Sequence, residues 1–162
     1  MSVKVLKSTG VTRKIDELGR IVVPKEIRKN LGIREGESLE IYTSDDAIVL
    51  KKHYEIWQNH ENIKRIINIA EDMLDLEVLV TDREKIILGS CKNTKLSVEL
   101  LSYIDNRQMY FGYVESLGDI YTLVPIISES SALGLIMIKE NVDNSKIGKF
   151  LARLIADKID IT

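Results

Sequence analysis

Seven basic side chains gather in one short part of this sequence, and their chemistry is the binding of anions. They are Lys7, Arg13, Lys14, Arg20, Lys25, Arg28 and Lys29. Guanidinium and ammonium groups donate charge-assisted hydrogen bonds to phosphate, and a cluster of them attracts polyanions. Between Met1 and Asn30, eight basic residues outnumber three acidic ones, which gives +5 on a chain whose net charge is −2. This segregation predicts a polyanion site; the alternative is a solvated surface on which the charges cluster by chance.

Other chemistries leave no comparable pattern. The sequence has no nucleophile elbow, P-loop, dinucleotide fingerprint or metal-ligand spacing, so we predict a protein that is not an enzyme, with no catalytic residue, cofactor or metal. Cys91 is the only cysteine, which excludes an intrachain disulfide. His53 and His60 are interpreted as solvated linker histidines rather than a metal pair. No apolar run reaches the roughly 18 residues of a membrane span, and no signal peptide opens the chain, so we expect a cytoplasmic protein.

The basic residues lie on a segment that begins, by prediction, as strand, turn and strand. Residues 11–15 and 21–23 are rich in β-branched side chains, which favour strands. The intervening residues 16–19 are typical of a turn, in which Gly19 can adopt positive φ.

A two-turn helix over residues 24–31 is predicted next. Pro24 suits the first helical position, where its missing N–H is not needed, and Gly32 suits a left-handed C-cap. Ile27 and Leu31 are four residues apart, so we expect them to form an inward apolar stripe opposite the basic residues.

A turn at residues 35–37 and a hairpin of residues 39–43 and 47–52 complete this segment. Four short strands and a two-turn helix bury too small a fraction of their surface to be stable alone. Because the segment has no disulfide or metal, we predict an obligate homodimer through it.

The rest of the chain is predicted to be an α+β domain. The pattern indicates a helix over residues 55–74, strands at 76–82 and 85–90, a helix at 96–105, strands at 120–127 and 133–140, and a helix from Asn144. This order implies a mostly antiparallel sheet with helices packed on it. The first and last helices carry broad apolar stripes, which could pack on the sheet or on a second subunit.

Residues 7–42, KSTGVTRKIDELGRIVVPKEIRKNLGIREGESLEIY, resemble the AbrB/SpoVT family of bacterial transition-state and sporulation regulators. The matching motifs are STG-x-x-RK-x-D-x-LGR, VVP-x-E-IR, LGI and LEIY. The resemblance implies an all-β swapped-hairpin barrel over residues 1–53, in which two chains interleave their strands into one dimeric unit that binds double-stranded DNA.

In that family the basic side chains form the surface that faces DNA. The resemblance therefore assigns DNA contact to Arg13, Arg20, Arg28 and Lys29, with Lys7, Lys14 and Lys25 as further backbone contacts. Lys29 stands where other members have arginine, so it keeps phosphate contact but loses the planar fork that can grip a guanine edge. We expect a nucleoid-associated bacterial regulator with salt-sensitive binding to AT-rich, deformable promoter DNA.

Residues 54–162 resemble the GAF-like domain that follows the DNA-binding half in the family's sporulation regulators. The resemblance implies tetramer formation through the terminal helices and a small-molecule effector site, which Tyr103, Tyr110, Phe111 and Tyr113 could line. Packing of these aromatic side chains in a seam between helix and sheet is the alternative, and the domain would then serve oligomerisation alone.

An antitoxin is the second functional hypothesis, because the same barrel occurs in toxin-neutralising proteins. Those proteins usually carry a short, flexible toxin-binding tail. This chain carries a second half that is rich in isoleucine and leucine and is predicted to fold, which favours the transcription regulator.

Overall fold

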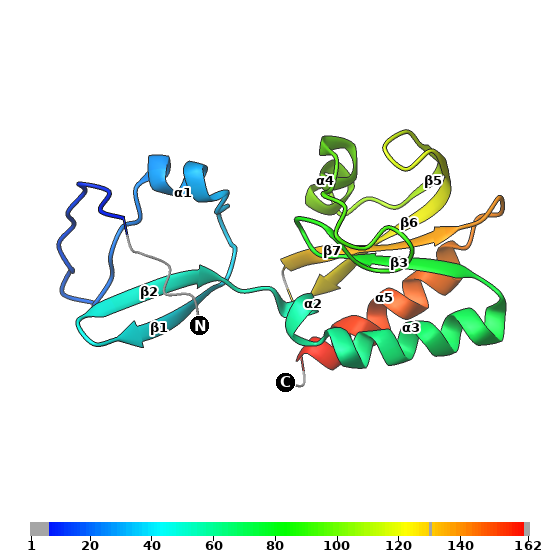
Figure 1. Ribbon diagram of the computed structural model, residues 1–162, viewed down its shortest axis with the longest axis horizontal. Helices are drawn as coiled ribbons and strands as arrows, with labels where there is room; N and C mark the ends of the chain where they lie inside the picture. Colours follow the sequence, from blue (N-terminus) through cyan, green and yellow to red (C-terminus); the bar gives the residue numbers. More distant parts are fainter. Residues whose placement is uncertain (1–6, 130, 161–162) are drawn as a thin grey trace. The chain divides into compact units, whose positions relative to one another are not determined.

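The computed structural model describes residues 7–129 and 131–160, and its contacts divide the chain into Met1–Ser38 and Leu39–Thr162. Lys4, which contributes to the basic excess, lies outside the described residues. The division after His53 that the sequence suggested stays a prediction. The elements in chain order are α1 (Lys25–Leu31), β1 (Leu39–Ser44), β2 (Ala47–Lys52), α2 (Glu55–Gln58), α3 (His60–Leu74), β3 (Glu77–Thr81), β4 (Ile86–Leu88), α4 (Val98–Asp105), β5 (Tyr110–Val114), β6 (Asp119–Ser128), β7 (Ser131–Lys139) and α5 (Ser145–Asp160) (Figure 1).

The short helix of the N-terminal unit forms where the sequence predicts it. Pro24 is its N-cap rather than its first residue, and the Pro24 carbonyl accepts the first helical hydrogen bond from the Arg28 N–H at 3.0 Å. Gly32 adopts the left-handed conformation with φ 61° and ends the helix as predicted. The Ile33 N–H then donates to the Arg28 carbonyl at 2.7 Å, so both ends of α1 are capped through the backbone.

The strands predicted at residues 11–15 and 21–23 are not formed within the single chain. None of residues 7–38 is buried, and Leu31, expected to turn inward, is 58% exposed. A strand needs a neighbouring strand to satisfy its backbone and a surface to cover its apolar face. The strand partners of residues 11–15 and 21–23 must therefore come from outside the N-terminal unit, or these residues remain unpaired.

The hairpin of β1 and β2 confirms its prediction, with antiparallel pairing from Leu39 opposite Lys52 to Ser44 opposite Ala47. Asp45 and Asp46 form the two-residue turn, and Asp45 adopts a φ of 37°. Aspartate tolerates this left-handed region better than most residues, which is why the pair suits a tight hairpin.

The single helix predicted over residues 55–74 is broken into α2 and α3. The break is at Asn59, whose φ of −97° and ψ of 11° depart from helical geometry. Its side-chain amide donates to the Glu55 carbonyl at 3.1 Å, next to the backbone bond from its own N–H to the same oxygen at 3.2 Å. Asparagine side chains compete with the helical backbone for hydrogen bonds in this way, and periodicity alone does not reveal it.

The predicted antiparallel α+β architecture is confirmed for the larger unit. Its sheet has five strands in the order β4-β3-β7-β6-β5, and every neighbouring pair is antiparallel. The sequence missed β5, because Gly112 interrupts a short aromatic run that lies between turn residues. Pairing with β6, from Tyr110 opposite Leu123 to Val114 opposite Asp119, makes this run a strand.

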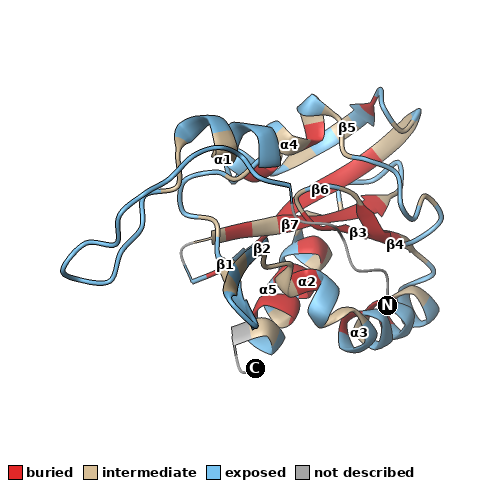
Figure 2. Ribbon diagram, turned by 60° about the vertical axis from the view of Figure 1, so that its left-hand side comes forward, coloured by how far each residue is buried: buried red, intermediate tan, exposed pale blue. Residues whose placement is uncertain are grey.

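Helices cover both faces of this sheet, with α3 and α5 on one face and α4 on the other (Figure 1). Alternation along β7 supplies both cores: Ile136 and Ile138 belong to the cluster with α3 and α5, whereas Leu135 and Met137 belong to the cluster with α4. All four side chains are fully buried, and β3, β4, β6 and β7 are coloured mainly as buried in Figure 2. Because both faces are covered, the central strands are nearly continuous runs of apolar residues.

The longest helices of the described residues are α3 and α5, with 15 and 16 residues. Each is amphipathic, with one apolar face and one charged face. Within the described part of the chain, no helix combines the length and the hydrophobicity that crossing a bilayer requires.

Candidate nucleic-acid interface

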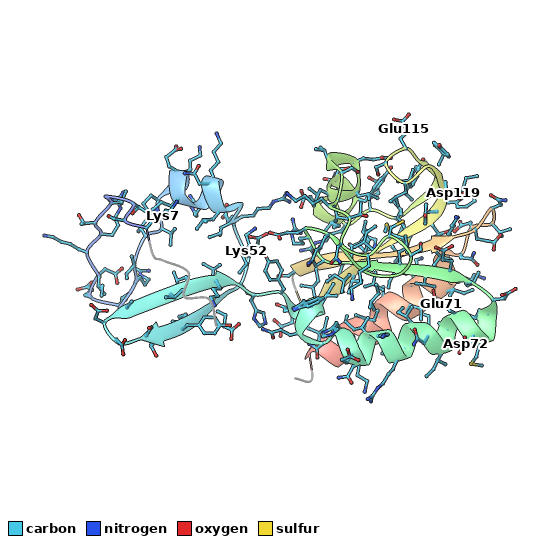
Figure 3. All side chains as sticks on the ribbon, viewed as in Figure 1. Lys7, Lys52, Glu71, Asp72, Glu115 and Asp119 are labelled. Carbon is cyan, nitrogen blue, oxygen red and sulfur yellow. The ribbon has the colours of Figure 1, made fainter. Side chains whose placement is uncertain are left out.

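All seven predicted basic residues lie in the N-terminal unit. Lys7, Arg13, Lys14 and Arg20 are on the irregular chain that precedes α1, and the other three are on α1 itself. Arg28 is half-buried and the other six are exposed. Figure 3 shows these side chains on the ribbon and labels Lys7. A single unit of the chain therefore presents every residue assigned to the interface.

The helix α1 carries charged residues in both its first and its last turn. Glu26 is in the first turn, and Arg28 and Lys29 are in the last. The positions of these three residues complement the helix dipole, whose positive end is at the N-terminus, whereas Lys25 at the first helical position opposes it. With seven residues, and as the only helix among residues 7–38, α1 is too short to act as the recognition helix of a helix-turn-helix motif.

The turn between Asp16 and Arg20 contains most of the hydrogen bonds of the described chain before α1. The Asp16 N–H donates to the Arg20 carbonyl at 3.0 Å, and the Gly19 N–H donates to the Asp16 carbonyl at 3.0 Å. Gly19 has a φ of 76°, where only glycine is free of strain. The Asp16 Oδ1 accepts from the N–H groups of Leu18 at 3.0 Å and Arg20 at 2.8 Å. These side-chain bonds stabilise the turn in addition to its backbone bonds.

The same carboxylate also holds the Arg20 side chain. Asp16 Oδ2 accepts from Arg20 Nε at 2.7 Å, while the Arg20 side chain remains 72% exposed. The hydrogen bond from the Arg20 backbone, followed by that from its guanidinium, lowers the pKa of Asp16 from 3.8. The carboxylate is therefore ionised at neutral pH.

The remaining basic residues are less constrained. Arg13 donates from Nη1 to the carbonyl of Thr12 at 2.8 Å. Among the described residues, Arg20 is the only one of the seven that forms an ion pair. The other six keep their full charge for a ligand, as a polyanion site requires.

Asp16 is a functional candidate that the sequence pattern does not indicate. In the sequence it is only a turn residue and one of the three acids that reduce the basic excess. Its position four residues before Arg20 is a signal that could have found the contact, although such pairs are usually sought on helices. Here a turn, rather than a helix, brings the two side chains together.

Comparison with known proteins agrees with this placement. The profile of the family described as "Antidote-toxin recognition MazE, bacterial antitoxin" matches residues 12–58. The transition state regulatory protein AbrB of Bacillus subtilis is 58% identical over 48 residues, which are 30% of this chain and 50% of AbrB. Stage V sporulation protein T of Bacillus subtilis is 35% identical over 151 residues, covering 82% of this chain and 84% of that protein.

The chain belongs to the AbrB/SpoVT family. The resemblance that the motifs of residues 7–42 indicated is thereby confirmed, and the match to stage V sporulation protein T is too long to be confined to the N-terminal half. The AbrB relative is named as a regulatory protein, which agrees with the prediction from the missing catalytic motifs that this chain is not an enzyme.

Among solved structures, the solution structure of the N-domain of the transcription factor AbrB is 57% identical to this AbrB/SpoVT chain. It covers 30% of this chain and 94% of its own, with a TM-score of 0.28. A second solution structure, of the N-terminal DNA recognition domain of Bacillus subtilis AbrB, is 58% identical over 30% of this chain, with a TM-score of 0.26.

Proposed function

We propose that this protein is a DNA-binding transcription regulator of the transition-state or sporulation type. Its N-terminal segment forms a swapped-hairpin barrel with a second copy, and the basic residues of both copies bind AT-rich promoter DNA. It acts in the bacterial cytoplasm, on the nucleoid. Residues 54–162 form a GAF-like domain that joins dimers into a tetramer and receives an effector.

One observation carries this proposal: exposed, mostly unpaired positive charge is concentrated in the segment that is most similar to a DNA recognition domain. Six of the seven basic residues form no ion pair among the described residues. AbrB, which is 58% identical to this chain over 48 residues, indicates the kind of polyanion, because a solved structure of its N-terminal domain is named for DNA recognition.

Salt dependence tests this proposal directly. If roughly six to eight phosphates are neutralised, the logarithm of the affinity should fall with the logarithm of the salt concentration at a slope of about −5 to −7. We expect this slope in fluorescence anisotropy titrations of an AT-rich, promoter-sized duplex. A slope near zero would contradict binding through the basic residues.

The homodimer is supported by apolar side chains that the single chain leaves uncovered. The exposed fractions of Val11, Ile15, Leu18, Ile21 and Val22 range from 43% to 72%. An apolar pattern of this size on so small a segment is typical of an interface rather than of a free surface. Interleaving with a second copy would bury it and pair the two predicted strands.

A fragment of residues 1–53 is therefore expected to sediment as a dimer, at about twice the mass of its chain, because the monomer cannot bury these side chains. Sedimentation equilibrium measures this mass directly. A stably folded monomer would contradict the swapped barrel, although it would leave the basic residues free to bind DNA.

The effector site rests on fewer side chains than the sequence suggested. Tyr103 and Tyr110 stack on each other with ring centroids 4.9 Å apart and pack against the core cluster of α4, so they form the seam between helix and sheet. Phe111 and Tyr113, which are 41% and 56% exposed, remain for contact with a ligand.

The antitoxin hypothesis has one observation in its favour, the match of the MazE antitoxin profile to residues 12–58. That match covers the DNA-binding segment, which both classes of protein share. The match to stage V sporulation protein T also includes residues of the second half, which favours the regulator.

A further inference from the structure

One carboxylate controls both the backbone and the guanidinium of Arg20. Asp16 Oδ1 binds the Arg20 N–H at 2.8 Å, and Asp16 Oδ2 binds Arg20 Nε at 2.7 Å. Two backbone bonds also close the turn, one from the Asp16 N–H to the Arg20 carbonyl and one from the Gly19 N–H to the Asp16 carbonyl. The direction of the Arg20 side chain is thus set by the turn that carries it.

This contact weakens Arg20 as a simple phosphate ligand. The ion pair of an arginine and a carboxylate carries little net charge as a unit, and phosphate binding gains its affinity from net charge and counterion release. The Asp16 carboxylate also repels phosphate on its own account. Since the other six basic residues have no such partner among the described residues, Arg20 is set apart from them.

The contact instead suits a directed hydrogen bond. With Nε engaged, bidentate donation by Arg20 must use Nη1 and Nη2, and the side chain is 72% exposed. Two parallel N–H donors match the O6 and N7 acceptors of guanine in the major groove. A fixed guanidinium also loses less side-chain entropy when it binds, which increases the energy difference between a matched and a mismatched base.

We propose that Asp16 is a positioning residue that makes Arg20 read a base edge, so that it lowers non-specific affinity for DNA and raises discrimination between sequences. This inference rests on the proposed DNA-binding function. The ligand is a base edge of double-stranded DNA, and the acting group is the Nη1/Nη2 edge of Arg20.

The test compares two duplexes of equal composition. One is the duplex most enriched by in vitro selection with the wild-type protein, and the other is a shuffled version of it. In Asp16→Asn the amide oxygen can still accept the two backbone bonds of the turn, while the negative charge is lost. We expect this variant to bind the shuffled duplex more tightly than wild type does, with a salt slope steeper by about 1 per chain, because Arg20 becomes free to pair with phosphate.

Discrimination is the decisive measurement. The ratio of the two dissociation constants is expected to fall at least about fivefold in Asp16→Asn, since a good bidentate base contact contributes discrimination of this order or more. Glu17→Gln is the matched control, because Glu17 is an exposed carboxylate beside Asp16 that forms no hydrogen bond or ion pair with Arg20. It should tighten binding to both duplexes equally and leave the ratio unchanged.

A second pair of variants tests whether a loss of discrimination in Asp16→Asn comes from Arg20 rather than from a folding defect. Arg20→Lys keeps the backbone bonds of the turn and the charge but removes the fork, so it should lose the same discrimination. Asp16→Asn added to Arg20→Lys should then change the ratio no further, because Asp16 acts through Arg20.

Two outcomes overturn the inference, and they differ. If the ratio is the same in wild type, Asp16→Asn and Arg20→Lys while all bind DNA, Asp16 is only a source of repulsion and a turn residue. If wild type binds neither duplex, the proposed DNA-binding function fails, and the role of Asp16 fails with it.

Discussion

Replacing Arg20 and Arg28 together by alanine is expected to raise the dissociation constant for an AT-rich promoter duplex by about 1,000-fold or more. Each arginine that contacts DNA contributes about 1–3 kcal/mol, and a dimer loses four of them. Arg20 is exposed on the turn and Arg28 is half-buried on α1, so the double variant removes one contact from each part of the proposed interface. Fluorescence anisotropy at about 100 mM salt measures the loss without the salt dependence intervening.

The matched control removes the same number of charges from the other unit. Lys64 and Arg65 are exposed on α3, and their joint replacement by alanine should change the dissociation constant less than about threefold. Circular dichroism and the melting temperature confirm that both variants are folded. If the folded Arg20, Arg28 variant bound as tightly as wild type, the basic residues would be a solvated surface, and the search would turn to protein partners.

Substitution of Gly134 by alanine is expected to lower the free energy of unfolding by about 2 kcal/mol or more. A Cβ on Gly134 would lie 1.9 Å from the Thr81 carbonyl oxygen and 2.8 Å from the Thr81 carbonyl carbon. This obstacle is backbone, and it is anchored, because Thr81 Oγ1 also accepts from the Leu135 N–H at 3.0 Å. Relief requires β3 and β7 to separate at the centre of the sheet.

Urea denaturation measures this loss as a lower midpoint with an unchanged slope. Gly148→Ala is the control, because its added Cβ would lie 2.5 Å from the Val124 side chain rather than from backbone. The gain in helix propensity, about 1 kcal/mol, offsets part of that clash, so a much smaller loss is expected. Equal midpoints for wild type and Gly134→Ala would show that the strands do not approach as closely as described.

Short sequence signals were sufficient to predict the ends of a helix and the turn of a hairpin. Pro24 and Gly32 mark the two ends of α1, and the Asp45-Asp46 pair marks the hairpin, because caps and tight turns depend on a few neighbouring residues. The strands of the central sheet were predicted equally well, since runs of buried apolar residues are evident in sequence.

Elements that depend on distant partners could not be predicted in this way. β5 becomes a strand only through pairing with β6. The break at Asn59 is a local feature that the apolar periodicity did not reveal, because the asparagine side chain bonds the Glu55 carbonyl four residues earlier. For residues 11–15 and 21–23 the sequence predicted strands that do not form in the single chain. Their residues favour strands, but no strand partner lies within the unit.

The amino-acid sequence is sufficient to identify which residues carry positive charge, where they are concentrated, and the family to which their spacing belongs. Side-chain type and order along the chain define these properties, and no folding is needed to read them. Only the folded chain shows that one of these charges is held by a carboxylate. Asp16 reaches the backbone and the guanidinium of Arg20 only because the turn through Gly19 reverses the chain. The relative direction of two side chains depends on this reversal and is not evident from the order of residues.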